Sequence, residues 1–423
     1  MKIKMSPTLG FAAFVFWLLA LPMNGPLLSA AGIADATQYF LLPHILSLGL
    51  IGAFLPADHF KKLAPACALA TILLSMALAL QPAAAPWLLI LVGVSGAFVA
   101  IDATTRLRCA KNPVLSAALG LVLGNFLLFI LHLHATNGLW HFALVALPLL
   151  ILLAPARHEA GPEDSFPWAN FLRYLPFVMV FHIVGGLMYS VLYPAYEPAA
   201  MVAGAELPFY MLTAVGAVWI IKKHQELTLI LGILLGMIAF ATLKFGHPLS
   251  INLSMFALQA GQGFVDLFLL AYLLSFHQRN RAVGLGLAVL CLGIFVGQFI
   301  GRNLQEFVGT IVMAGHISLN LAVLTLYFFG RRRHEAIEPA APPSEAKTQN
   351  SPPLEERVPE HMRLLLSQRE CLVLAHSLDG RTYREIAADL DISESSVKTY
   401  MKRICDKLGV RGRKGLFEAL EAR

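Results

Sequence analysis

The chain has 423 residues, of which 57% are hydrophobic and only 14% are charged, and its formal net charge is +6. A mean hydropathy of +0.67 is too high for a soluble enzyme of this length, so the composition indicates a polytopic membrane protein. The five cysteines are scattered without a CxxC pair, so neither a disulfide framework nor a metal site is predicted, and no cofactor is expected.

Apolar stretches long enough to cross a bilayer recur along the first three quarters of the chain. A spanning helix needs about 20 mostly apolar residues. The first stretch follows a basic N-terminus and resembles a cleaved signal peptide, but its length and the stretches that follow favour an uncleaved first span. Twelve spans are predicted, at residues 8–29, 38–55, 63–81, 86–102, 113–134, 138–154, 173–194, 206–221, 226–243, 249–275, 283–301 and 307–330.

The placement of lysine and arginine between these spans predicts an orientation. Cytoplasmic loops of membrane proteins carry an excess of both residues. With the N-terminus inside, the inside segments hold sixteen of them, and the outside loops hold only Lys244 and Arg302. Both termini are therefore predicted to lie in the cytoplasm.

The longest inside loop, "PARHEAGPEDSFPWANFLRY", divides the spans six and six. The loop after the second span, "GAFLPADHFKKL", carries Gly52, Asp58 and the pair Lys61–Lys62 in the order of the motif G-x-x-x-D-R-x-G-R-R. His59 replaces the usual Arg, and the internal Gly is missing. Residues 8–330 thus resemble the major facilitator superfamily, a resemblance that implies two six-helix bundles with a ligand cavity between them.

Polar residues within the predicted spans are candidates for a ligand site, because an ionisable side chain in a membrane is costly without a role or a partner. Gln259, Gln262 and Asp266 follow i, i+3, i+7 spacing, which places them on one helix face, and His182 or His316 could partner Asp266. The alternative is hydrogen bonding between helices without a ligand. The same alternatives stay open for His44, Asn125, Gln298 and Asn320.

Glycines recur at four-residue spacing in the eleventh predicted span, at Gly293, Gly297 and Gly301. This pattern favours close helix packing over a gating hinge.

The composition changes after Gly330. Arg331, Arg332 and Arg333 follow the last span and are expected beside anionic lipid headgroups. The stretch that follows is polar, rich in proline and without periodicity, which is typical of a disordered linker. The predicted organisation is a membrane domain at 1–333, a linker at 334–361 and a helical module at 362–423.

The C-terminal module contains three helix starts with capping signals. Ser367 is followed by Glu370, Thr382 by Glu385, and Ser393 by Ser396, and Gly380 ends the first helix. On the last of these helices, Val397, Met401, Ile404 and Leu408 share an inward face. Lys398, Thr399, Lys402 and Arg403 lie on the other side. Two helices joined by a tight turn, the second with basic and hydroxyl groups, form a helix-turn-helix.

The stretch "LSQRECLVLAHSLDGRTYREIAADLDISESSVKTYMKRICDKLGVRGRKGL" resembles the LuxR-type (NarL/FixJ-like) DNA-binding domain, a four-helix fold. Departures such as Tyr400 are mild. The resemblance implies double-stranded DNA as partner, with Lys398, Thr399 and Lys402 facing the major groove. It implies backbone contacts from Thr382, Ser393, Ser396, Arg403 and Lys407, and a homodimer formed through Leu416 and Leu420 of a last helix. RNA polymerase is a further candidate partner.

Three functions fit this all-α chain. The favoured one is a membrane-bound, one-component transcriptional regulator of the bacterial inner membrane, which senses a small molecule through its twelve-span bundle. The others are a transporter with an appended regulatory domain, and a membrane scaffold whose module binds no DNA. No GxSxG, P-loop, HExxH or paired-carboxylate motif is present, so an enzyme is not predicted.

Overall fold

The computed structural model describes residues 6–23, 25–33, 37–134, 138–154, 166–200, 202–303, 308–335, 366–390, 392–408 and 410. Across them the chain is helical, with turns and without a strand, so the all-α prediction is confirmed. The chain divides into two compact units, Met1–Glu338 and Pro339–Arg423. Most of the predicted linker, the predicted last helix, Leu416 and Leu420 lie outside the described residues.

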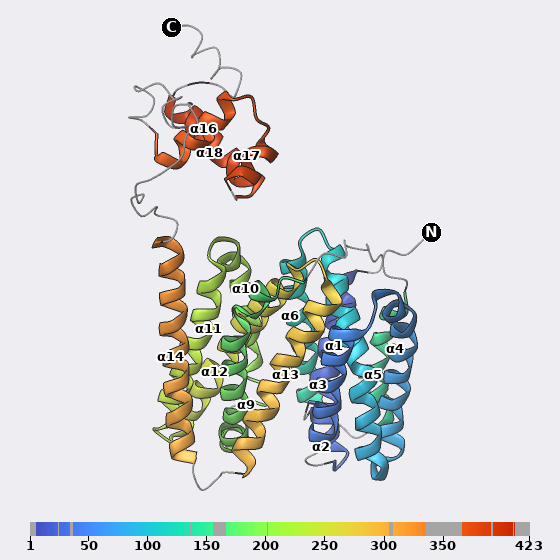
Figure 1. Ribbon diagram of the computed structural model, residues 1–423. Helices are drawn as coiled ribbons and strands as arrows, with labels where there is room; N and C mark the ends of the chain where they lie inside the picture. The colour runs from blue at the N-terminus through green and yellow to red at the C-terminus, as the bar shows by residue number, and fades with distance from the viewer. Residues whose placement is uncertain are drawn as a thin grey trace. The chain divides into compact units, whose positions relative to one another are not determined.

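Helices occupy all twelve stretches in which a span was predicted (Figure 1). Seven of the described helices are long and apolar enough to cross a membrane, and four others are shorter apolar helices. The first half contains α1 (Pro7–Ala20), α2 (Pro26–Ala30), α3 (Thr37–Phe54), α4 (Ala57–Leu80), α5 (Ala85–Arg106), α6 (Pro113–His134) and α7 (Leu139–Ala146). The second contains α8 (Trp168–Leu172), α9 (Leu175–Tyr196), α10 (Leu207–Lys223), α11 (Gln225–Leu243), α12 (Pro248–Leu274), α13 (Arg279–Asn303) and α14 (Val308–Glu335).

Some predicted boundaries were wrong. The first stretch is broken between α1 and α2, where Pro26 starts a new helix after Gly25. The sixth continues from α7 as a 3-10 segment, Leu147–Leu153, because Pro148 cannot donate the next α-helical hydrogen bond. The charged residues Asp58 to Lys62, predicted as loop, form the first turns of α4.

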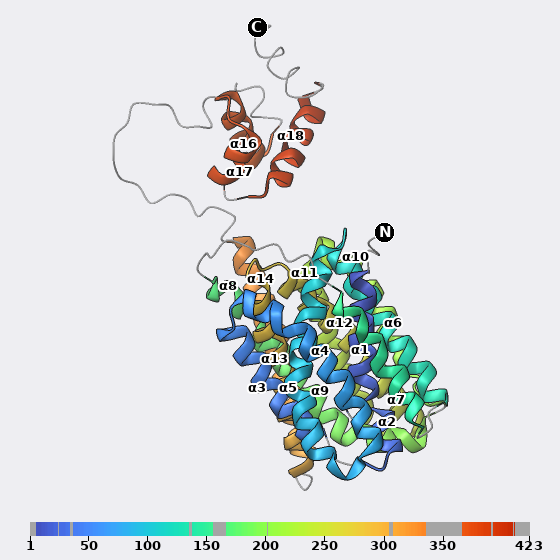
Figure 2. The same cartoon turned by 90° about the vertical axis from the view of Figure 1, so that its right-hand side faces the viewer.

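The membrane unit consists of two helix groups that run side by side (Figures 1 and 2). In the first, α1 packs on α6 and α5 packs on α3 and α4; in the second, α9 packs on α13 and α12 packs on α10 and α11. The groups meet where α3 contacts α13 and α6 contacts α10. A Cβ atom on Gly52 would lie only 2.9 Å from the Leu285 nitrogen, so this junction depends on glycine.

The second unit, for which the sequence predicts DNA binding and which we therefore call the DNA-binding unit, has a hydrophobic core of its own. Its described helices are α16 (Gln368–Leu378), α17 (Tyr383–Asp389) and α18 (Glu394–Leu408). Val397, Met401 and Ile404 are buried, as predicted, and Leu408 packs against them. Leu374 and Ile386 complete this core from the other two helices. Because the cluster draws only on residues of this unit, the unit is expected to fold independently.

Candidate functional sites

Asp266 lies in the interior of the membrane unit and joins three helices. Its Oδ1 lies 3.2 Å from His182 Nε2 of α9, and its Oδ2 accepts a hydrogen bond of 2.8 Å from the Tyr210 hydroxyl of α10. The His182 side chain is almost fully buried, whereas that of Asp266 keeps 25% of its surface exposed. Of the two partners that the sequence suggested, the structure selects His182.

Tyr189, which the sequence analysis did not predict, contacts both predicted glutamines of the same helix face as Asp266. The Gln259 side chain donates to the Tyr189 hydroxyl at 2.7 Å, and this hydroxyl lies 3.4 Å from Gln262 Oε1. Tyrosine counts as mostly apolar in a hydropathy pattern, so Tyr189 and Tyr210 gave no signal. We call Tyr189, Tyr210, His182, Asp266, Gln259 and Gln262 the polar cluster.

Close packing between α9 and α13 fixes the position of His182. A Cβ on Gly293 would lie 2.8 Å from His182 Cβ, and one on Gly297 would lie 2.0 Å from the Ile183 carbonyl oxygen. A Cβ on Gly301 would lie 2.5 Å from Ser190 Cβ. The close-packing interpretation of this glycine repeat is therefore confirmed.

A second acid lies near the same cluster. Glu206, at the start of α10, is buried and accepts a hydrogen bond of 2.8 Å from the Tyr196 hydroxyl. Tyr189 and Tyr196 lie seven residues apart on α9, with Tyr193 between them and 40% exposed. At 100° per residue these tyrosines share one helix face with His182, so a tyrosine stripe leads from the helix end to Asp266.

Three other polar residues in the predicted spans have local partners. His44 Nδ1 lies 3.0 Å from the Gly93 carbonyl, which joins α3 to α5. Asn125 and Asn320 each donate to the carbonyl four residues earlier in their own helices. These contacts fit a packing role.

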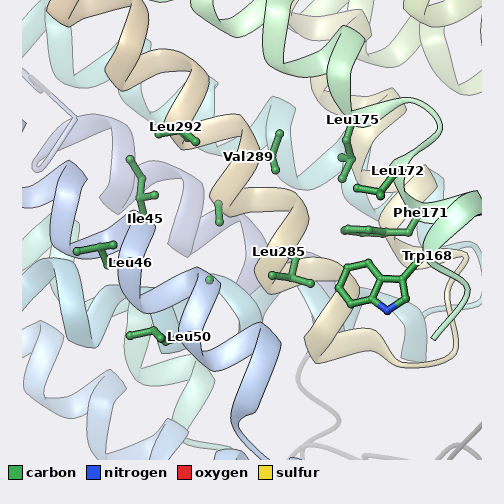
Figure 3. Close-up of a pocket in the computed structure, with 12 residues that line it drawn as sticks. Ile45, Leu46, Leu50, Trp168, Phe171, Leu172, Leu175, Leu285, Val289 and Leu292 are labelled. Atoms are coloured by element: carbon green, nitrogen blue, oxygen red, sulfur yellow. The ribbon is translucent and has the colours of Figure 1, made fainter. Parts of the chain in front are cut away.

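A groove of about 400 Å³ lies elsewhere, between α3 and the α8–α9–α13 side (Figure 3). Trp168 and Phe171 line one end, and Leu46 and Leu50 line the α3 side. Its lining contains no member of the polar cluster and is apolar. Such a surface suits hydrocarbon and offers nothing to orient a polar solute, so we place the candidate ligand site at the polar cluster instead.

The cations predicted to lie on one face of α18 are on its surface. Lys398, Thr399, Lys402 and Arg403 are all exposed. The Lys398 ammonium lies 2.9 Å from Glu394, a pair in which both side chains stay at least half exposed, and the Thr399 hydroxyl donates to the Ser395 carbonyl at 2.9 Å. Exposed pairs of this kind are weak, so the lysine remains available to a phosphate or a base.

Capping interactions hold the ends of α17 and α18. The Thr382 N–H and hydroxyl each donate to the Glu385 carboxylate at 2.8 Å, which lowers the pKa of this carboxyl. The Ser396 N–H donates to the Ser393 hydroxyl at 3.1 Å. Both predicted caps are confirmed, and a capped N-terminus directs its remaining N–H groups towards an anion such as phosphate.

Lys407 has an internal partner that the sequence did not predict. Its ammonium donates to Glu370 Oε2 at 2.7 Å, and the same carboxylate accepts the Ser367 N–H at 2.8 Å in the capping box of α16. Burial alone would raise the pKa of Glu370, but these hydrogen bonds outweigh it and the pKa is lowered. Lys407 therefore joins α18 to α16, whatever it contributes to a DNA backbone.

Comparisons with known proteins agree with the description of both the membrane unit and the C-terminal helical unit. Residues 364–419 match the family described as "Bacterial regulatory proteins, luxR family". They form a LuxR-type helix-turn-helix domain. Over 78% of this chain, the fold is similar to the crystal structure of the human organic anion transporter MFSD10 (TETRAN), with a TM-score of 0.56, 14% sequence identity and 99% of that chain covered. No curated protein matches the chain.

The protein is thus an integral membrane protein that combines a major-facilitator-like helical region with a LuxR-type DNA-binding domain. Neither is an enzyme family.

Proposed function

We propose that the protein is a membrane-bound, one-component transcriptional regulator that binds DNA through α17 and α18 and senses a small molecule through its membrane unit. The observation that carries this proposal is the presence of a LuxR-type domain and a facilitator-like bundle in one chain. A DNA-binding domain needs an input, and the bundle is the other large unit of the chain.

DNA recognition is assigned to the basic face of α18. Lys398, Thr399 and Lys402 face the major groove, and Thr382, Ser393, Ser396, Arg403 and Lys407 contact the phosphate backbone. The exposure of these cations and the capped helix starts support this assignment. A single small domain binds weakly, so we expect a homodimer on paired half-sites, with RNA polymerase as a candidate contact once bound.

Sensing is assigned to the polar cluster. In this proposal all twelve helical stretches cross the bacterial inner membrane and both termini lie in the cytoplasm, where the domain reaches DNA. Ligand binding shifts the two helix groups between arrangements, and the shift changes dimerisation of the DNA-binding domain. A ligand can do this only by binding one arrangement more tightly than the other.

Genome-wide occupancy in the native cell tests the proposal. Full-length protein is compared with the Lys398→Ala/Lys402→Ala variant, at matched membrane abundance. Discrete peaks for the wild type that vanish in the variant are expected. Equal profiles for both proteins, or no peaks for either under every growth condition tried, would refute the regulator.

A transporter with an appended regulatory domain is the second candidate, and the similarity to a solved organic anion transporter favours it. Such a protein would move substrate across vesicles after residues 355–423 are deleted. Within the described membrane helices, however, every Lys and Arg lies within about two turns of a helix end, so none at mid-membrane could receive an anion.

A further inference from the structure

The apolar groove of Figure 3 opens on the surface of the membrane unit and follows α13. Leu285, Val289 and Leu292 line it at i, i+4, i+7 spacing, which corresponds to a length of about 10 Å. That is about two thirds of the hydrocarbon depth of one bilayer leaflet. Leu46 and Leu50 on its α3 rim are 57% and 59% exposed, so the groove is open from the side. It therefore has the length, the opening and the lining to hold the upper part of one acyl chain.

Arg281 lies at the mouth of this groove, in the first turn of α13 and one turn before Leu285. Its guanidinium carbon lies 5.1 Å from the ring centroid of Trp168, which lines the groove, and 5.2 Å from that of Phe166. Trp168 is 46% exposed, and tryptophan is enriched where a bilayer meets water. The mouth therefore lies at the level of the lipid headgroups.

The Arg281 guanidinium has donors without acceptors. Among the described residues it forms no hydrogen bond or ion pair, and its Nε is buried. Arg106, at the same end of the bundle, instead pairs with Asp102 at 2.7 Å. A buried donor without an acceptor is costly, and the fork of a guanidinium matches the oxygens of a phosphate. The mouth thus holds a positive charge that no described carboxylate compensates and that suits a phosphate.

We propose that the groove binds an anionic phospholipid, with the upper part of one acyl chain in the groove and the phosphate on Arg281. An anionic headgroup balances the charge of the guanidinium, whereas a zwitterionic headgroup would bring a second cation beside it. Because α3 belongs to one helix group and α9 and α13 belong to the other, the bound lipid contacts both groups. The site is separate from the polar cluster and goes beyond the proposed regulator, since it does not depend on DNA binding.

The test uses full-length protein in phosphatidylcholine vesicles and measures tryptophan fluorescence. The probe is phosphatidylglycerol brominated on the upper part of its acyl chains, because bromine quenches a tryptophan that it touches. Phosphatidylcholine with the same brominated chains is the matched probe. We expect a quenching step that saturates at a low mole fraction of the anionic probe and is absent with the zwitterionic one. Trp168→Phe should remove this step, whereas Trp219→Phe, which removes a 64% exposed tryptophan of α10, should leave it.

Two further variants test the headgroup and the chain separately. Arg281→Gln should raise the mole fraction at half-saturation by about tenfold, the loss expected for a hydrogen bond to a charged group. Lys223→Gln removes an exposed cation at the end of α10 and should leave it unchanged. Gly49 lines the groove, and a Cβ there would meet nothing within 4 Å. Gly49→Leu should therefore fill the groove and abolish the step without lowering the unfolding temperature.

The outcomes that overturn the proposal are distinct from those that support it. Equal quenching by the two probes in the wild type would mean that only bulk lipid is in contact with the protein. A step that survives Trp168→Phe would lie elsewhere, and a step that Arg281→Gln leaves unchanged would not involve this guanidinium. If Gly49→Leu does not fold, the comparison of Arg281→Gln with Lys223→Gln still decides.

Discussion

The two units of the chain arrange apolar and polar residues in opposite ways. Among the described residues, every exposed large hydrophobic side chain lies between Leu9 and Leu324, in the membrane unit, and none lies in the DNA-binding unit. Phe54 is 78% and Leu212 70% exposed, as suits a lipid-facing surface. In the DNA-binding unit the exposed side chains of α18 include its cations, and the apolar ones are buried.

This difference teaches where function can be expected in each unit. Lipid surrounds the membrane unit, so the polar groups in its interior must form hydrogen bonds with one another. A polar group there that needs a further partner, such as a ligand, indicates a functional site. Water surrounds the DNA-binding unit, so a single cation on its surface costs little free energy and indicates no function by itself. The grouping of several cations on one helix indicates a binding surface for DNA. Because each unit has its own core, a mutation in one core should lower the stability of that unit without that of the other.

The largest effect is expected from Ile404→Ala. Ile404 is fully buried in the small core of the DNA-binding unit, and truncating a buried isoleucine costs about 2–5 kcal/mol of unfolding free energy. A core of this size has little stability to lose. Circular dichroism of the 339–423 fragment should show a largely unfolded variant, whereas the exposed change Lys402→Ala on the same helix should melt like the wild type.

The stability of the membrane unit should be sensitive to Gly297→Ala. The new Cβ would lie 2.0 Å from the Ile183 carbonyl oxygen and force α13 away from α9, at a cost of about 1–3 kcal/mol. Gly216 on α10 has nothing within 4 Å of an added Cβ, so Gly216→Ala is the matched control. Thermal unfolding of the full-length protein in detergent should fall for the first variant only. Equal stability of both would mean that the glycine repeat does not set this packing.

Much of the fold was predictable because membrane helices and capped helices leave local signals. Apolar stretches located the helical segments of the bundle apart from the short α8, which lies in the predicted inside loop, and three capping pairs located the starts of α16, α17 and α18. The breaks around Pro26 and Pro148 were missed, since hydropathy windows do not respond to a proline that interrupts an apolar run. The helical turns from Asp58 to Lys62 were missed because charge was taken as a sign of loop.

The candidate site was only partly predictable, for a physical reason. The face of Gln259, Gln262 and Asp266 follows from helical spacing, which is local. The choice of His182 over His316 depends on contacts between α9 and α12 across 84 residues of sequence. Glu206 lies at the start of α10 and its partner Tyr196 at the end of α9, where hydropathy is uninformative. Lys407 was assigned to DNA because its partner, Glu370, lies on another helix.

DNA affinity should respond to Arg403→Ala, an exposed residue assigned to the phosphate backbone, without loss of the fold. Removing one phosphate-facing cation should weaken binding about evenly across sequences and reduce the slope of log K against log salt by about one. Asp406→Asn removes an exposed negative charge one turn along the same helix and should instead strengthen binding slightly. The measurement is fluorescence anisotropy of the 339–423 fragment at several salt concentrations. Equal losses in both variants would assign the effect to folding.

The smallest effect is expected from Lys407→Ala, and it separates a structural role from a DNA-contacting one. The lowered pKa of Glu370 means that its ionised form stabilises the folded unit above the ordinary glutamate value, 4.5, and that this stability is lost as pH falls through the lowered folded value. Without Lys407 the folded pKa should rise, so acid unfolding of the fragment should begin at a higher pH. At neutral pH the pair, in which the Lys407 side chain is 44% exposed to the screening solvent and the Glu370 side chain only 4%, should contribute about 1 kcal/mol. Introducing Glu370→Gln into both the wild type and the Lys407→Ala variant should abolish their difference in acid, which isolates the pair. An unchanged acid midpoint together with a weaker DNA complex would instead assign Lys407 to the phosphate backbone, as the sequence first suggested.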